Sequence, residues 1–414
     1  MMSTHYFSGR HIVIAGGGMA GLSFAIALRK LWPGSLLPAP RVTVFERDTK
    51  LDAAGREGYS LSLAGFDSTG GLVALKDLGL LDEILGHALT GLGETGAFKI
   101  WDADWSEVMS VRLRPAEGLP TSLIRIKRKD LRQTLLRAVG EDTVHWGVAC
   151  LAATKLEDGK VTVQLSGHAQ PSIECDLLIV ADGANSKIRA SLRPDDGLEY
   201  AGAVQMGGIA RFPAGVPPPL NNNWGMQLSG GQGVGCFYAQ VDDTSAVWGL
   251  SFLEKEPRQR LTFSTFHSQE AIRAVQEEGR RRGHMLGPLF HTMVDATTDH
   301  AIVFPARDKK PFGHTMDLPV VFIGDANHAV SPFAGYGASL ALKDGWDLAQ
   351  QLVTAGSVEE AVRRYDAISV PRANKALSTS RFRIKWFHCT GWTFFFARAL
   401  LVVGGLMLRL MGRD

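Results

Sequence analysis

The chain has few cysteines and no marked excess of charge of either sign. Its 414 residues include four cysteines, Cys150, Cys175, Cys236 and Cys389, and no two of them form a C-x-x-C pair. This scatter argues against a zinc site or a redox pair and is typical of a reducing compartment. The formal net charge of +2 gives no support for nucleic-acid binding. We therefore expect a cytoplasmic protein with no metal and no nucleic-acid partner.

The sequence also lacks a signal-peptide pattern and a long uninterrupted apolar run. Residues 386–411 are mostly apolar and aromatic, but Arg398 and Arg409 interrupt them. A helix that spans a bilayer needs about 18 consecutive apolar residues. The segment is therefore predicted to be a helix packed on its own domain. Its basic, aromatic composition leaves peripheral contact with a membrane surface open.

What is present begins with a strand, a glycine turn, a helix and a second strand in the first 46 residues. The turn, Gly16-Gly17-Gly18-Met19-Ala20-Gly21, has the G-x-G-x-x-G spacing. In this motif glycines allow the tight turn, the approach of a pyrophosphate and close packing of helix on strand. Glu46 lies at the end of the second strand, where a carboxylate accepts hydrogen bonds from ribose hydroxyls. The segment predicts dinucleotide binding.

Two further motifs follow apolar strands. Asp182-Gly183 comes after residues 177–181, and Gly324-Asp325 comes after residues 319–323. The second motif continues into Pro332-Phe333-Ala334-Gly335-Tyr336-Gly337, whose glycines would let backbone N–H groups approach a flat ring and stabilise negative charge on it. A complete second G-x-G-x-x-G is absent, because Cys236 stands where the third glycine of residues 231–236 is needed. We interpret that stretch as a hairpin turn.

The pattern of elements predicts an α/β fold. A Rossmann-like domain with a parallel sheet is expected to be discontinuous, over residues 1–198 and 301–370. Short β-prone runs between turn residues predict an inserted, mostly antiparallel substrate domain at 199–300, with parts of 59–120 contributing. Residues 371–414 are expected to form C-terminal helices. Further helices are predicted at 72–85, 129–139 and 257–284.

Together the three motifs resemble the fingerprints of class A flavoprotein monooxygenases, the group typified by p-hydroxybenzoate hydroxylase. The resemblance covers about residues 10–370 and is closest to tetracycline-inactivating and small fungal secondary-metabolism members. Two positions depart from the family pattern: Tyr336 stands where glutamine or asparagine is common, and Asn327 replaces the second alanine of Ala-Ala-His.

The resemblance implies FAD as cofactor and NADH or NADPH as a transient co-substrate. It places Arg56 beside the flavin's phosphate and ribityl chain and Arg128 near the FAD, each with a surface ion pair as the alternative, and it implicates Asp182 in interactions with FAD and NAD(P)H. The predicted cofactor-binding residues are Gly16, Gly18, Gly21, Glu46, Arg47, Arg56, Arg128, Asp182, Gly324, Asp325, Pro332, Gly335, Gly337 and Ala338.

Substrate contacts are expected from the inserted sheet and from the loop under the flavin. The candidates are Tyr59, Gln205, Met226, Gln227, Tyr238 and Phe333, each with ordinary packing as the alternative. No catalytic residue is assigned. His314 and His328 are candidate acid–base groups, and for His328 a structural role is favoured. The region's few charges indicate a small hydrophobic or aromatic substrate.

The implied activity is hydroxylation of an electron-rich aromatic, enol or indole-type molecule by dioxygen, through a flavin 4a-hydroperoxide. A Baeyer–Villiger or epoxidising reaction on a polycyclic metabolite uses the same fold and stays open. The Trp-x-Trp-x-Ile-Pro segment of flavin-dependent halogenases is absent. A flavin-binding protein without turnover is the remaining alternative.

Overall fold

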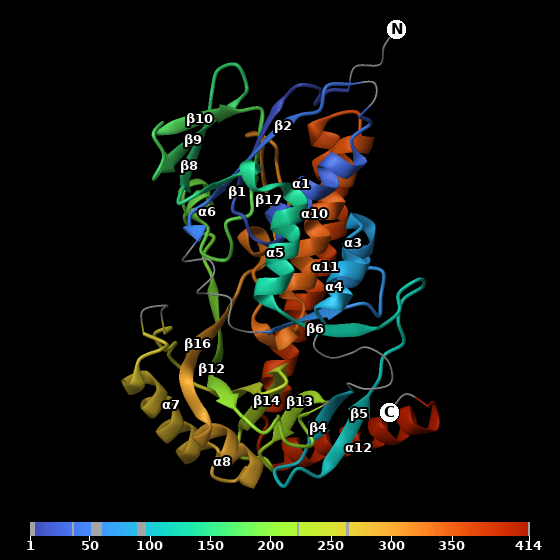
Figure 1. Ribbon diagram of the computed structural model, residues 1–414, viewed down its shortest axis with the longest axis vertical. Helices are drawn as coiled ribbons and strands as arrows, with labels where there is room; N and C mark the ends of the chain where they lie inside the picture. The colour runs from blue at the N-terminus through green and yellow to red at the C-terminus, as the bar shows by residue number, and fades with distance from the viewer. Residues whose placement is uncertain are drawn as a thin grey trace.

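The computed structural model describes residues 5–34, 37–50, 60–88, 97–221, 223–261 and 265–412. Two β-sheets, one above the other in Figure 1, form its framework. The upper sheet has the order β17-β11-β1-β2-β7 and all its described pairings are parallel. Its strands are β1 (His11–Ala15), β2 (Arg41–Glu46), β7 (Val144–Trp146), β11 (Leu177–Val180) and β17 (Val320–Phe322).

Both faces of this parallel sheet are buried. Side chains of Ile12 and Ile14 face helices α1 (Met19–Leu31), α5 (Arg128–Val139) and α10 (Gly337–Thr354), whereas Val13 and Ala15 belong to the opposite core. That second core lies under an antiparallel sheet of β8 (Ala149–Lys155), β9 (Val161–Ser166) and β10 (Ser172–Cys175). Burial on both faces explains the continuous apolar runs that predict these strands.

The larger sheet has the order β16-β12-β15-β14-β13-β4-β5, and only the β13–β4 pair among its described pairings is parallel. Helices α7 (Gln269–Arg282) and α8 (Pro288–Asp295) cover its outer face (Figure 1). Its strands are β4 (Phe98–Trp101), β5 (Glu107–Val111), β12 (Glu199–Arg211), β13 (Trp224–Leu228), β14 (Val234–Asp242), β15 (Ser245–Leu253) and β16 (Thr297–Asp308). Strand β16 crosses the expected boundary at residue 300, and the division into domains stays a prediction.

Smaller elements join the two halves. Strands β3 (Ser60–Ala64) and β6 (Leu123–Lys127) form an antiparallel pair between the sheets (Figure 1). Helix α11 (Val358–Phe387) runs from the upper half to the large sheet, and α12 (Gly391–Leu410) lies beneath β4 and β5. The remaining elements are α3 (Gly71–Leu78), α4 (Leu81–Gly86), α6 (Lys187–Leu192), α9 (Asp325–His328), and the short turns η1 (Glu141–Thr143) and η2 (Pro332–Ala334).

The fold class agrees with the prediction, but two helix predictions need correction. The helix expected at 72–85 is two helices, because Gly79 at φ +80° ends α3 in the left-handed conformation. The helix expected from residue 257 begins only at Gln269, where Ser268 caps it by accepting a hydrogen bond from the Ala271 N–H at 3.1 Å. The hairpin predicted at 231–236 does connect β13 to antiparallel β14.

Candidate functional site

The three sequence motifs meet at one edge of the parallel sheet. Strands β17, β11, β1 and β2 are neighbours and point the same way, so their carboxyl ends share this edge. Gly16, Asp182 and Gly324 each come at or just after such an end, although about 300 residues separate the first from the last. Ligands of open α/β sheets bind outside the carboxyl ends of the strands.

Backbone packing at the first turn requires glycine. Gly16 has φ +111°, and a Cβ there would lie 2.4 Å from the Ala181 carbonyl oxygen. A Cβ on Gly21 would lie 2.2 Å from the carbonyl oxygen of Gly16, so the helix could not approach the turn. At Gly18 the protein offers no such obstacle, since its nearest neighbour, the oxygen of Ala181, is 4.0 Å away. The open side of Gly18 fits close approach of a phosphate.

Glu46 lies at the end of β2, directly beside this turn. Its carboxylate accepts hydrogen bonds from the Gly17 N–H at 3.0 Å and the Asp48 N–H at 2.9 Å. Arg132 of α5 pairs with the same carboxylate at 3.3 Å and donates to the Gly17 carbonyl at 3.2 Å. Sequence reasoning missed Arg132. The signal was its position one helical turn after Arg128, on the same face of α5.

Asp182 has an unused acceptor. One carboxylate oxygen, Oδ2, accepts from the Lys187 N–H at 3.0 Å, while Oδ1 is buried without a hydrogen-bond partner among the described residues. Burial raises the pKa of the Asp182 carboxyl. Hydrogen bonds from Ser186 and from the Lys187 backbone lower it, but burial has the larger effect. A buried acceptor without a donor is costly in a folded protein, and a donor on a bound molecule would satisfy it.

Asp325 is the first residue of α9. Its side chain is exposed to solvent, although many protein atoms lie near its carboxyl group. Desolvation raises the pKa of its carboxyl; His328, Arg128 and Arg189 act in the opposite direction. Arg128, at the start of α5, is therefore close enough to Asp325 to act on it electrostatically across almost 200 residues of sequence. Such a carboxylate can accept hydrogen bonds from the hydroxyls of a ribityl chain.

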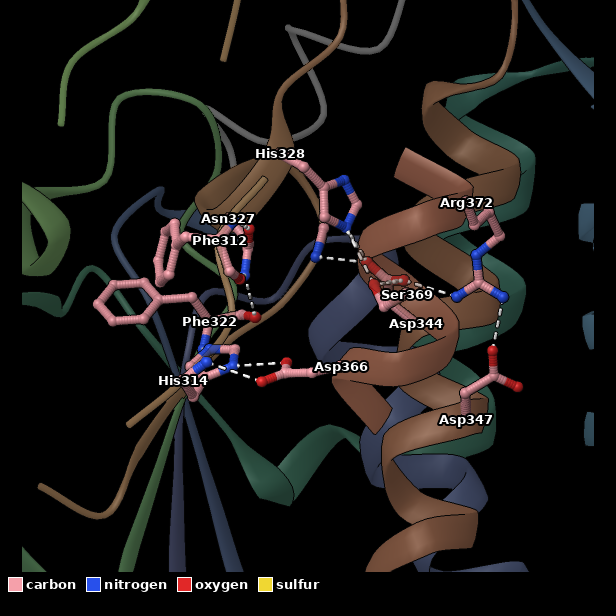
Figure 2. Close-up of polar contacts among 11 residues, drawn as sticks. Phe312, His314, Phe322, Asn327, His328, Asp344, Asp347, Asp366, Ser369 and Arg372 are labelled. Carbon is pink, nitrogen blue, oxygen red and sulfur yellow. Dashed lines mark hydrogen bonds and ion pairs between the residues drawn. The ribbon is translucent and has the colours of Figure 1, made fainter. Parts of the chain in front are cut away.

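A buried polar network lies behind Gly324 and holds it in place. Asp344 of α10, which is fully buried, accepts hydrogen bonds from the Gly324 N–H at 2.8 Å and from Ser369 at 3.0 Å. It also pairs with His328 Nε2 at 2.6 Å and with Arg372 at 2.8 Å (Figure 2). The two cations keep the pKa of Asp344 well below its usual range, despite burial.

His328 therefore has a structural environment. Burial would lower the pKa of its imidazole, but the adjacent Asp344 carboxylate outweighs this effect and the pKa is raised. His314 is also structural: Nδ1 donates to Asp366 at 2.8 Å and Nε2 accepts from the Phe322 N–H at 2.9 Å (Figure 2). Because described protein atoms bond both nitrogens of His314, the structure favours a structural role for it, and its acid–base role stays a prediction.

The loop after α9 is held from the opposite side by α11. Arg383 donates to the carbonyl oxygens of Phe333 at 3.2 Å and Ala334 at 2.9 Å. Gly335 has φ +71°, and added Cβ atoms at Gly335 and Gly337 would meet no atom of the described residues within 4 Å. Protein packing thus does not explain the absence of a side chain at Gly337, whereas a flat ring stacked on the loop would.

These features fit FAD. The glycine turn and Glu46 suit the pyrophosphate and ribose, Asp325 suits the ribityl chain, and the open glycines suit the ring. The structure also places Pro332 and Ala338 at the two ends of that loop, while Arg47 is largely exposed and lies 3.7 Å from Asp48. Arg56 and Tyr59 lie outside the described residues.

Two substrate candidates lie on the far side of the large sheet. Tyr238 and Gln227 are fully buried on the outer side of the large sheet, under α7 and α8. The Tyr238 hydroxyl donates to Gln227 at 2.6 Å, and Gln227 donates to the carbonyl of Ala103 at 2.9 Å. Their polar groups are satisfied by protein, and they face away from the cofactor half.

The inner face of the same sheet carries Met226 and Gln205. Met226 is paired with Phe237, and Gln205 with Ser251, whose hydroxyl contacts His388, directly after α11, at 2.9 Å. Phe333 packs near Ala203 and Ala306 and contacts the His388 ring at 5.9 Å. These three candidates thus lie on the side of the sheet that meets the cofactor half. Sequence reasoning missed their neighbours Trp224, Phe237 and Arg125.

The comparisons with known proteins agree with this geometry. The model of the FAD binding domain family matches residues 10–380. Monooxygenase cfoF of Aspergillus candidus is 42% identical over 399 residues, which cover 94% of each chain. Chloroplastic zeaxanthin epoxidase of Oryza sativa subsp. japonica is 27% identical over 391 residues, covering 88% of this chain and 53% of the epoxidase.

A solved structure shows the same fold at lower identity. HpxO of Klebsiella pneumoniae, complexed with FAD and uric acid, superimposes with a TM-score of 0.75 at 21% identity and covers 98% of this chain and 97% of its own. Together with the family match, this confirms the resemblance to class A flavoprotein monooxygenases and FAD as the cofactor. The chain belongs to the FAD binding domain family and is an FAD-dependent monooxygenase of the hydroxylase or epoxidase type.

Proposed function

We propose that this enzyme uses NAD(P)H and dioxygen to hydroxylate an electron-rich aromatic, enol or indole-type small molecule. The observation that carries the proposal is that Phe333, in the loop at Pro332–Gly337, packs near Ala203 of β12 and Ala306 of β16, so that the inner face of the large sheet meets this loop. Trp224 and Phe237 on that face bury apolar surface, and Met226 adds an adaptable side chain. A planar apolar substrate fits between such a face and a flat cofactor ring.

The protein's part is to bind, orient and exclude water. We assign the phosphates to Gly16, Gly18 and Gly21, the ribose to Glu46, and the ribityl chain to Asp325. The chemistry that bound FAD supplies is acceptance of hydride from NAD(P)H and activation of dioxygen. With FAD bound, backbone N–H groups at the start of α10 would stabilise negative charge on the reduced ring.

Epoxidation or Baeyer–Villiger oxidation of a polycyclic metabolite is the second candidate. The identity to zeaxanthin epoxidase favours epoxidation, although this chain covers only 53% of that enzyme. The products separate the candidates, because hydroxylation replaces a C–H bond with C–OH, whereas epoxidation adds one oxygen across a C=C bond.

A panel of phenols, indoles, enols and alkenes, assayed aerobically with NADPH and with NADH, tests the proposal. We expect at least one phenol, enol or indole to raise NAD(P)H consumption and to gain one hydroxyl group, detected by mass spectrometry. If only alkenes raise NAD(P)H consumption, and the products are epoxides, the enzyme is an epoxidase and hydroxylation is contradicted. Flavin content without substrate-stimulated consumption by any class would contradict hydroxylation and epoxidation alike.

We further propose peripheral membrane contact through α12, with a cytoplasmic location for the rest of the chain. By length and composition this helix could cross a membrane, and 17% of its most apolar window is buried. Trp392 is 89% exposed and Leu410 is 81% exposed. Ion pairs of Arg398 with Asp102 at 2.5 Å and of Arg409 with Glu107 at 2.9 Å fix the other side of the helix to the large sheet.

Co-sedimentation with anionic phospholipid vesicles measures this contact. We expect the full chain to bind, and the triple variant Trp392→Ser, Phe396→Ser, Leu410→Ser to lose most binding, because it removes exposed apolar area. The exposed Leu253→Ser on the large sheet serves as the control, with unchanged binding. Equal sedimentation of protein with and without vesicles would reject membrane contact.

A further inference from the structure

Arg125 is a buried arginine that sequence reasoning did not select. It lies on β6, where the β3–β6 pair passes between the two halves of the molecule (Figure 1). The residue is 4% exposed. Its guanidinium donates to Ser62 Oγ at 2.7 Å and to the carbonyl of Ser60 at 3.2 Å, both neutral acceptors.

No carboxylate compensates this charge within the described part of the chain. Nε of Arg125 has no hydrogen-bond partner there. Burial alone lowers the pKa of its guanidinium to about 9, with no acidic group acting on it. The other buried arginines differ: Arg132 pairs with Glu46, and Arg189 lies among Asp182, Asp196 and Asp325. Buried charges are normally paired, so this one indicates a partner outside the described protein atoms.

A second buried donor beside it also lacks an acceptor. Nε1 of Trp224, on the inner face of β13, has no hydrogen-bond partner among the residues described. The Arg125 guanidinium carbon lies 5.9 Å from the centroid of the Trp224 ring and 5.7 Å from that of Phe237. Two side chains with an unsatisfied N–H donor, Arg125 and Trp224, therefore lie next to each other and to the Phe237 ring, on the face assigned to the substrate.

We propose that Arg125 and Trp224 bind an anionic oxygen of the substrate, so that the substrate is an aromatic or enolic acid rather than a neutral hydrocarbon. The proposal rests on the proposed function, since it names the substrate class for the same site. Guanidinium and indole N–H groups can only donate hydrogen bonds. An oxygen anion can accept a hydrogen bond from both of them. The aromatic rings hold the apolar body of the same molecule.

A direct test compares anions with neutral molecules of the same shape. Calorimetric titration of the FAD-loaded enzyme uses 1-naphthoate against 1-naphthamide, and 4-nitrophenolate against 4-nitroanisole. The first pair tests a carboxylate and the second a phenolate. We expect wild type to bind at least one anion about ten- to a hundred-fold more tightly than its neutral partner, as hydrogen bonds to a charged group imply.

Arg125→Met should abolish this preference, Arg125→Lys should keep part of it, and Trp224→Phe should reduce it several-fold while retaining the ring. Arg211→Gln, which removes an exposed arginine paired with Asp299 on the same sheet, is the control and should keep the full preference. Equal binding of anion and neutral partner by wild type, or an undiminished preference in Arg125→Met, would overturn the proposal.

Thermal unfolding separates binding from a structural role. Because Arg125 makes no ion pair with described residues, we expect Arg125→Met to melt at the same temperature as wild type or higher. A lower melting temperature combined with no anion preference in wild type would show that Arg125 only joins β3 to β6. Binding is measured without turnover, so an enzyme that prefers anions yet oxidises no substrate would contradict the proposed function and not this inference.

Discussion

Replacement of Asp344 by alanine is expected to lower the free energy of unfolding by about 3–5 kcal/mol. The carboxylate is fully buried and balances two cations, His328 and Arg372. Its loss leaves Asp347 as the carboxylate paired with Arg372 among the described residues and removes the acceptor of the Gly324 N–H. Urea denaturation measures the change. Asp299→Ala, at an exposed ion pair, is the matched control and should cost less than about 1 kcal/mol.

The same network predicts how stability depends on pH. The pKa of Asp344 is lowered in the fold, so its contribution is present above the ordinary carboxyl pKa and is lost as pH falls through the folded value. The pKa of His328 is raised, so its contribution is present below about 6.5 and is lost as pH rises through the folded value. Asp344→Ala should therefore flatten the alkaline fall in stability. An unchanged pH profile would show that the pair is not charged in wild type.

Asp325→Ala is expected to lose FAD while the chain remains folded. A carboxylate that accepts hydrogen bonds from ribityl hydroxyls contributes about 1.5–3 kcal/mol, so the dissociation constant should rise about ten- to a hundred-fold. The visible absorption of the purified variant measures its flavin content. Normal content would show that Asp325 does not bind the cofactor.

Stability distinguishes loss of the ligand from loss of the fold. Asp325 is exposed to solvent, and replacement of an exposed side chain usually changes stability by less than about 0.5 kcal/mol. The FAD-free variant should therefore melt at about the same temperature as FAD-free wild type. Excess FAD, at a hundred times its dissociation constant, should stabilise wild type by ~2.7 kcal/mol. The same FAD concentration should stabilise Asp325→Ala much less.

The cofactor half was predictable because its signals are local. A strand, a glycine turn and a helix follow one another within residues 11–31, and the conformation of Gly16 belongs to that turn alone. Gly16 and Gly324 were expected to lie at the same edge of the sheet, because the carboxyl ends of neighbouring parallel strands share one edge. No distant contact had to be known.

The substrate half was less predictable because it depends on strand register. Met226 and Gln227 are adjacent in sequence, yet only Met226 faces inward, and a shift of one residue would exchange them. Arg125 resembles a surface residue of an amphipathic strand until the structure shows it buried against Trp224. The partners of Asp344, such as Ser369 and Arg372, come from a different helix that no local pattern links to it.

The most direct test of the account is the visible spectrum of the purified protein during anaerobic titration with NADPH or NADH, followed by admission of air. We expect oxidised flavin bands at the start, bleaching as hydride is transferred, and return of the bands when dioxygen enters. A colourless protein that takes up no FAD, or a bound flavin that neither nucleotide reduces, would contradict it.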